Sequence, residues 1–150
     1  MSNEEIVLDA LRSLGRAHAQ DLRSRAADMD GTALIAEEHK APVWRQDKDY
    51  SAWPVGAPVT YEGQVYKLLQ PHNAAYYPGS TPANTPALWS ITHTTDPARA
   101  KPWAAPMGTS GMYMAGECCL WTGNIYRCTQ DNTVHDPGAL PGAWEAVSGL

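Results

Sequence analysis

The sequence has no cluster of positive charge and no long apolar run. Its formal net charge is −5, so phosphate backbones and anionic lipid surfaces find no patch of Lys and Arg to attract them. No apolar run approaches the roughly 20 residues that a membrane-spanning helix needs. We therefore expect neither nucleic acid nor a membrane among the partners of this protein.

The chain also lacks the signature of a secretory signal peptide. Its first five residues, Met-Ser-Asn-Glu-Glu, are acidic where the start of such a signal is basic. We expect a protein that is made without a signal peptide and assembled in the cytoplasm.

Cysteine is scarce, and its placement does not suggest a metal site. Cys118, Cys119 and Cys128 are odd in number and lack the paired spacing of zinc ligands. His135 as a fourth ligand would not complete a zinc site, because the adjacent Cys118 and Cys119 point to opposite faces of a strand and cannot both easily reach one ion. Cys119 and Cys128 could lie diagonally on one hairpin face, where a disulfide would be strained. We expect free thiols and no bound metal.

Motifs of known catalytic sites are absent as well. The sequence contains no H-E-x-x-H, P-loop, dinucleotide fingerprint or G-x-S-x-G. The nearest approaches to a catalytic set are Cys128 with His135-Asp136 and the carboxylate pair Asp47 and Asp49. Short loop-rich modules seldom enclose a cleft around such groups. We expect a protein that is not an enzyme and that carries no cofactor.

The first 40 residues are predicted to be helical. Ser2 and Glu5 have the spacing of a capping box, in which each side chain binds a free backbone amide of the first turn. Asp30-Gly31 is expected to end the helix. A mostly apolar stripe with steps of three or four residues runs between these points: Val7, Leu11, Leu14, His18, Leu22, Arg25 and Met29.

A lone helix cannot bury such a stripe. The stripe can pack on its own β-modules, on a sister chain or on a larger assembly, and the pattern leaves all three open. We assign residues 1–40 as an anchoring or oligomerisation segment, and we expect a homo-oligomer.

After Lys40 the sequence consists of short runs rich in Trp, Tyr, Pro and Gly, which is typical of small β-domains with long loops. Landmarks recur in the same order along this part, which indicates duplication of one folding unit. The aligned segments are Trp53-Pro-Val-Gly56 with Tyr113-Met-Ala-Gly116, Tyr61-Glu-Gly-Gln-Val-Tyr66 with Trp121-Thr-Gly-Asn-Ile-Tyr126, and Pro78-Gly79 with Pro137-Gly138.

The predicted fold is mainly β with an N-terminal α-helix, and its two tandem aromatic-rich modules span residues 41–95 and 96–150. Each module is a hairpin or a three-stranded sheet, with turns at Glu62-Gly63 and Thr122-Gly123. Alternation places Val59, Tyr61, Gln64 and Tyr66 on one face, with Val65 and Lys67 on the other. Modules this small need aromatic residues to form a core: Trp44, Trp53, Tyr66, Trp89, Trp103, Tyr113, Tyr126 and Trp144.

Both copies resemble the chitin-binding type 3 modules, which are carbohydrate-binding module families five and twelve. The pattern of these families runs Trp, Tyr, Gly, Val-x-Tyr-x-Gly, x-Tyr, Pro, Trp. The first copy has Trp44, Trp53, Gly56, Val59-Thr-Tyr61-Glu-Gly63, Tyr66, Pro78 and Trp89, and the second has Trp103, Tyr113, Gly116, Cys119-Leu-Trp121-Thr-Gly123, Tyr126, Pro137 and Trp144. The resemblance implies a small β-module that binds polysaccharide. Members that bind chitin often carry an aromatic pair where this chain has Gln70-Pro71 and Gln130-Asp131, which argues against crystalline chitin as the ligand.

Sugar recognition places aromatic rings against the apolar face of a pyranose, with polar groups at the rim. Tyr76 and Tyr77 lie in a loop rich in Pro and Gly, where both rings cannot enter the core. The candidate glycan-binding residues are Tyr61, His72, Asn73, Tyr76, Tyr77 and Trp121. The alternative is that these side chains only cover the hairpin or the neighbouring module.

An acidic helical start, the stretch Met29 to Glu38 and tandem modules of this kind also resemble small virion proteins encoded in phage and prophage tail gene clusters. This resemblance implies a tail- or capsid-associated adhesion protein that is released by lysis. It would contact other virion proteins through residues 1–40 and host cell-surface polysaccharide through its modules. The alternative is a purely structural decoration or spacer protein whose modules make protein contacts.

Overall fold

The computed structural model describes residues 2–147, which form an N-terminal helical segment followed by two small β-sheets. The helices are α1 (Asn3–Arg25) and α2 (Gly31–Ala36). The strands are β1 (Pro58–Tyr61), β2 (Gln64–Leu68) and β3 (Trp89–Ile91) in the first sheet, and β4 (Lys101–Pro102), β5 (Cys118–Trp121), β6 (Asn124–Cys128) and β7 (Trp144–Ala146) in the second. The chain is mainly β after the helical segment, as predicted.

Helix α1 begins where the sequence predicted. Glu5 N donates to the Ser2 hydroxyl at 3.2 Å, and Ser2 N donates to the Glu5 carboxylate at 3.0 Å, so the capping box is complete. No helix of the described part of the chain is long and apolar enough to span a bilayer.

The predicted end of this helix at Asp30-Gly31 was wrong. Helix α1 ends at Arg25, and after one 3₁₀ turn Asp30 becomes the N-cap of α2, with its carboxylate accepting from Ala33 N at 2.8 Å. An Asp-Gly pair can stop one helix or start another, and here the Asp side chain satisfies a free amide of the second helix.

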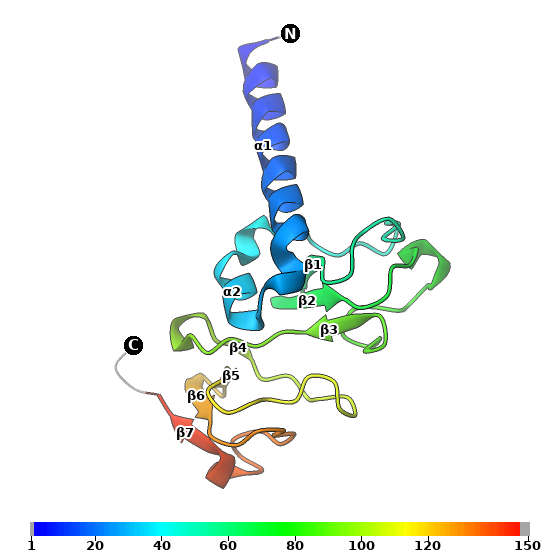
Figure 1. Cartoon of the computed structure of the whole chain (residues 1–150). Coiled ribbons are helices and arrows are strands. Elements are labelled where there is room, and N and C mark those ends of the chain that lie inside the picture. The colour runs from blue at the N-terminus through cyan, green and yellow to red at the C-terminus, as the bar shows by residue number, and fades with distance from the viewer. Residues whose placement is uncertain (1, 148–150) are drawn as a thin grey trace.

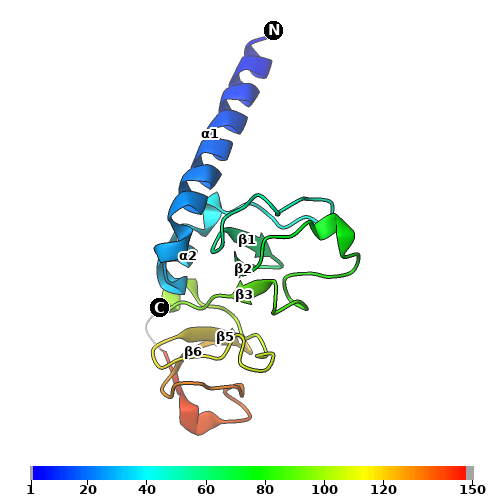
Figure 2. The ribbon, with the colours of Figure 1, turned by 45° about the vertical axis from the view of Figure 1, so that its right-hand side comes forward.

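The apolar stripe of α1 is buried only at its C-terminal end. Leu22 is fully buried, whereas Val7, Leu11 and Leu14 are 57%, 59% and 52% exposed. Figures 1 and 2 show the reason: α1 projects away from both sheets, and only its last turns reach the first one. Of the three partners considered for the stripe, the protein's own β-modules therefore cover only the last turns of α1.

The helical segment covers one face of the first sheet. Leu22 and Ala26 from the end of α1, and Leu34 and Ile35 from α2, pack with Val65 of β2 in one fully buried cluster. Two further contacts join the helical segment to the first sheet region. The Lys67 ammonium donates to Met29 O at 2.6 Å, and the Cα of Ala27 lies so near Gly56 that any Cβ there would approach it to 2.8 Å.

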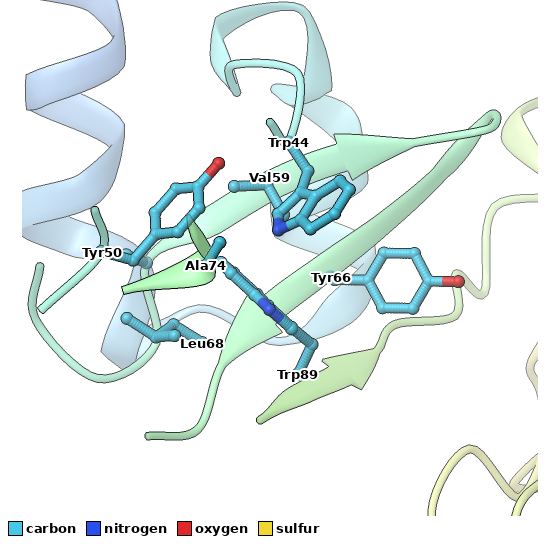
Figure 3. Packing of buried hydrophobic residues seen from close by; sticks show 8 residues of the cluster. Trp44, Tyr50, Val59, Tyr66, Leu68, Ala74 and Trp89 are labelled. Carbon is cyan, nitrogen blue, oxygen red and sulfur yellow. The ribbon is translucent and has the colours of Figure 1, made fainter. Parts of the chain in front are cut away.

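The opposite face of the first sheet carries an aromatic core. Trp44, Tyr50, Val59, Tyr66, Leu68, Ala74 and Trp89 converge there (Figure 3). The register pairs Val59 with Tyr66 and Tyr61 with Gln64, so the predicted division of the hairpin into two faces is confirmed. The turns are also confirmed: Glu62 and Gly63 both have positive φ, as do Thr122 and Gly123, which is the requirement of a type I′ turn.

The second sheet has a similar but thinner core. Tyr113, Cys119, Cys128, Ala143 and Trp144 are buried, and Trp103, Trp121 and Tyr126 pack against them while partly buried. All three cysteines are free thiols and buried. Burial raises the pKa of Cys119 to about 12 and also raises the pKa of Cys118.

The two sheets share a set of backbone hydrogen bonds. Trp44 N donates to Thr60 O and Trp103 N to Leu120 O, both at 2.8 Å. Gly56 N and Gly116 N likewise donate to Leu68 O and Cys128 O. In both, the opening tryptophan lies beside the first hairpin strand on a parallel edge segment, which the sequence did not predict.

The alignment of Tyr113 with Trp53 was wrong. Tyr113 N donates to Thr133 O and its hydroxyl accepts from Ala104 N, whereas in the first module it is Tyr50 whose N donates to His72 O and whose hydroxyl accepts from Arg45 N. Tyr50 is therefore the counterpart of Tyr113. The error arose because the two loops place their tyrosines at different distances from the glycine that was used as the anchor.

Candidate functional site

The candidate ligand face is formed by the loop between β2 and β3, residues 69–88, which we call the ligand loop. Tyr76 is 79% exposed and Tyr77 is 48% exposed, and the pair closes a single 3₁₀ turn, Ala74–Tyr76, that Asn73 caps by accepting from Ala75 N at 3.0 Å. As predicted, the two rings stay out of the core. The loop therefore offers two adjacent aromatic surfaces to solvent.

Gln46 fixes the backbone of this loop. Its Nε2 donates to Ala74 O at 2.6 Å and to Tyr77 O at 3.0 Å, and its Oε1 accepts from Gly79 N at 3.2 Å. One side chain thus satisfies three backbone groups around the tyrosine pair. Sequence reasoning missed Gln46, because these contacts join residues about 30 positions apart and no local motif announces them.

A chain of aromatic contacts connects Tyr77 to the core. The ring centroid of His72 lies 6.0 Å from that of Tyr77 and 5.6 Å from that of Trp89, with both pairs edge to face. His72 is 9% exposed, and its Nδ1–H donates to Gln70 O at 2.7 Å. The structure therefore places His72 beneath Tyr77 as a support, with little ring surface of its own left for a ligand.

Further along, Asn84 and Thr85 hold the second half of the loop. Asn84 accepts from Thr81 N at 2.7 Å and donates to Gly79 O at 3.0 Å, while the Thr85 hydroxyl donates to Thr81 O at 2.5 Å. The long loop is thus ordered by side chains rather than by strand pairing. An ordered loop pays less conformational entropy when it binds a ligand.

Tyr61 does not join this face. It lies at the end of β1 beside the hairpin turn, while the loop leaves from the other end of β2. Its ring stands edge-on to Trp44, with centroids 5.5 Å apart, and is partly buried against the aromatic core.

Trp121, the sixth candidate, belongs to the second sheet. It packs edge-on to Tyr126, with centroids 5.9 Å apart. The ring also lies so close to Gly138 that a Cβ there would approach it to 2.5 Å, which explains why a glycine follows Pro137. The structure thus brings His72, Asn73, Tyr76 and Tyr77 together and leaves Tyr61 and Trp121 elsewhere.

Trp53, which is partly buried, has a different role from Tyr76 and Tyr77. The Arg23 guanidinium of α1 lies 4.5 Å from the centre of its ring, and the Lys48 ammonium lies 5.5 Å from it. Trp53 also packs edge-on against Tyr50. The Arg23 contact joins the helix to the module, so Trp53 is a docking residue for α1.

Titratable groups do not gather at the candidate face. Asp49 is exposed and its pKa is lowered, mainly because its side chain accepts hydrogen bonds from Ser51. The described residues contain no group of three or more His, Cys, Asp and Glu side chains that could hold a metal ion. The face can therefore offer ring stacking and rim hydrogen bonds to a ligand, which is the chemistry of sugar recognition.

Comparison with known proteins agrees with this geometry. Residues 43–90 match the model of carbohydrate-binding module family 5/12. The chain is also similar to Streptogrisin-C of Streptomyces griseus, with 54% identity over 39 residues, and to Chitinase A1 of Niallia circulans, with 44% identity over 60 residues.

These similarities are local. They cover 26% and 40% of this chain, respectively, and 8% of the length of each relative. The matched family segment runs from the parallel edge beside Thr60 to β3, and so includes the aromatic core and the Tyr76–Tyr77 loop. Residues 43–90 are a carbohydrate-binding module of family 5/12.

Proposed function

We propose that this protein is a non-catalytic polysaccharide-binding protein whose first module contacts its ligand through Tyr76 and Tyr77. The observation that carries the proposal is the exposure of both rings on a loop that Gln46 and His72 hold in place. A preformed aromatic surface suits a pyranose ring, whose C–H face is apolar.

Chitinase A1 acts, by its name, on chitin, and this makes polymers of N-acetylglucosamine the first ligands to test. The positions after the hairpin read Gln70-Pro71 rather than an aromatic pair. We therefore propose a soluble or cell-surface polysaccharide, rather than the flat face of crystalline chitin, as the ligand.

The second sheet is proposed to be a diverged copy of the same module. Its shared hydrogen bonds and the equivalence of Tyr113 with Tyr50 support this. It has Val134 and His135 near the place of the tyrosine pair, so we assign it a spacer role or a weaker ligand contact.

The projecting half of α1 is proposed to attach the protein to a larger assembly. Ile6, Val7, Leu8, Leu11 and Leu14 are all more than half exposed, and an apolar helix face of this length is stable in water when a partner covers it. The resemblance of the sequence to phage tail-cluster proteins favours a virion as that assembly. Display in many copies would strengthen a weak sugar site by effective concentration alone.

A glycan array and a pull-down with whole bacterial cells test the proposal. Wild-type protein is compared with Tyr76→Ala/Tyr77→Ala and with a control, Val55→Ala/Leu140→Ala, that removes two exposed apolar side chains elsewhere. We expect wild type and control to bind the same glycans and the tyrosine variant to lose them. A folded wild type that binds no glycan would refute the adhesion role and favour the purely structural one.

A further inference from the structure

An open pocket of about 220 Å³ lies between the two sheets. One wall consists of Tyr66, Trp89 and Ile91 from the first sheet, and the facing wall comes from the loop that follows β4, including Ala105 and Ser110. Residues 82–86 of the ligand loop close a third side. The pocket is therefore distinct from the exposed Tyr76–Tyr77 surface.

Two buried aromatic side chains bring unused polar atoms to this pocket. Tyr66 is 5% exposed and Trp89 is 2% exposed, yet among residues 2–147 neither the Tyr66 hydroxyl nor Trp89 Nε1 takes part in a hydrogen bond. Neither atom belongs to the fully enclosed side-chain atoms that lack a partner. Figure 3 shows the Tyr66 hydroxyl pointing outward from the labelled cluster.

In the second sheet the equivalent indole nitrogen is satisfied within the chain. Trp144, the counterpart of Trp89, donates from Nε1 to His135 O at 2.9 Å. Because neither the Trp89 Nε1 nor the Tyr66 hydroxyl is fully enclosed, water can satisfy both in the free protein. A ligand that displaces this water has to supply hydrogen-bonding groups of its own.

Size and lining restrict what that ligand is. A dry cavity of about 150 Å³ accommodates a benzene molecule, so a pocket of about 220 Å³ has room for one six-membered ring. Aromatic and alanine walls suit an apolar ring face, while the Tyr66, Trp89 and Ser110 polar atoms suit hydroxyl or amide groups at its edge.

We propose that this inter-module pocket is a second carbohydrate site, which takes a single pyranose ring of a chain end or short oligosaccharide. The inference rests on the proposed polysaccharide-binding function and assigns it a site that needs both modules. Neither module alone presents the facing walls.

The junction between the modules holds this pocket open before ligand arrives. Gln64 Nε2 donates to Pro102 O at 2.7 Å, and Lys101 forms an ion pair with Glu38. The linker adds a backbone bridge from Thr94 to Cys118 and a stacked contact of His93 on Tyr113, with centroids 3.7 Å apart. A preformed pocket avoids much of the ordering cost of binding.

The test follows methyl and indole NMR signals of the full chain during titration with the N-acetylglucosamine trimer. We expect the Trp89 indole N–H and the methyl groups of Ala83, Ala105 and Ile91 to shift. Tyr66→Phe keeps the ring and removes one hydrogen bond. We expect the dissociation constant obtained from these shifts to rise about tenfold in this variant.

A second pair of variants keeps the test independent of folding. Ala83→Leu/Ala105→Leu fills the pocket from two exposed positions, and Ala98→Leu/Ala139→Leu makes the same change at exposed positions outside it. We expect the filled variant to lose the pocket shifts and the control to keep them. Unchanged binding in the filled variant would overturn the inference.

The two proposals fail in different ways. Loss of shifts in Tyr76→Ala/Tyr77→Ala with normal shifts in the filled variant would support the surface site and refute the pocket. Pocket shifts that persist in the tyrosine variant would support the pocket and separate it from the surface site. An absence of any shift in folded wild type would refute the pocket for this sugar, while the glycan array still decides the proposed function.

Discussion

Tyr50 and Tyr113 make the same contacts in the two sheets. Each side chain is fully or almost fully buried, and each hydroxyl accepts a hydrogen bond from the backbone amide of the residue after the opening tryptophan. Each ring also stands edge-on to the closing tryptophan, with centroids 5.2 Å apart for Tyr50 and Trp89 and 5.1 Å apart for Tyr113 and Trp144. This tyrosine therefore connects the segment after the opening tryptophan to the closing tryptophan in each of the two sheet regions.

Replacing either tyrosine by phenylalanine should destabilise its module. Tyr50→Phe leaves the Arg45 amide without its partner, and Tyr113→Phe does the same to Ala104, at a cost of about 1–3 kcal/mol each. Urea unfolding followed by tryptophan fluorescence measures this. Tyr76→Phe is the matched control, since that side chain is exposed, and an equal loss of stability in the control would contradict the assignment.

Gln46→Ala should weaken polysaccharide binding more than it weakens the fold. The substitution removes three hydrogen bonds that hold the Tyr76–Tyr77 loop. All three bonds are made to this loop, outside the aromatic core. We expect faster amide exchange at Tyr77 and Gly79 and several-fold weaker binding. Gln70→Ala, which removes one bond to Ala87 O, should change neither quantity as much, and equal behaviour of the two variants would argue against a positioning role for Gln46.

The linker histidine should make the junction sensitive to acid. His93 is buried, donates from Nε2 to Gly111 O at 2.9 Å, and has its pKa lowered by desolvation. The folded state therefore disfavours the charged form, and the stability that this contributes is present above the ordinary histidine pKa of about 6.5 and is lost as pH falls below it. We expect unfolding free energy to drop between pH 7.5 and pH 5.

His93→Phe keeps a ring against Tyr113 but cannot titrate, so its stability should fall less over this range. Glu117 lines the same pocket as His93, and burial raises its pKa, so its own contribution runs in the opposite direction. Because Glu117 is present in both proteins, the difference between wild type and variant isolates His93. Parallel pH profiles for the two proteins would contradict the prediction.

The hairpin turns should accept asparagine with a gain in stability. Glu62 and Thr122 have φ of 48° and 49°, a region that costs ordinary side chains about 1 kcal/mol and that Asn tolerates better. Glu62→Asn and Thr122→Asn should each raise the unfolding free energy by a few tenths of a kcal/mol to ~1 kcal/mol in urea titrations. A loss of stability in both would show that their side chains make contacts that matter more.

Local chemistry made part of this fold predictable from sequence. The capping box of Ser2 and Glu5, the turns at Glu62-Gly63 and Thr122-Gly123 and the two-residue alternation of the hairpin each depend on neighbours in the chain. The exposure of Tyr76 and Tyr77 was predictable for the same reason, since Pro and Gly surround them.

Contacts between distant segments were not predictable. Gln46 holds a loop about 30 residues away, and the His93 ring stacks on Tyr113 in the core of the second sheet. Asp30 could end one helix or cap another, and only packing of Leu34 and Ile35 on Val65 decides for the second. The counterpart of Tyr113 was misassigned because insertions in loops leave the order of residues intact while they change the spacing.

The central claim is that the Tyr76–Tyr77 surface of the family 5/12 module binds polysaccharide. A binding isotherm with a soluble N-acetylglucosamine polymer tests it most directly. Wild type is compared with Tyr76→Ala/Tyr77→Ala and with Val55→Ala/Leu140→Ala, after urea unfolding has shown that all three proteins are equally stable. The account predicts saturable binding by wild type and control. It predicts about 5- to 150-fold weaker binding by the tyrosine variant, since each of the two lost aromatic stacking contacts is worth about 0.5–1.5 kcal/mol. Equal binding by all three proteins would contradict it.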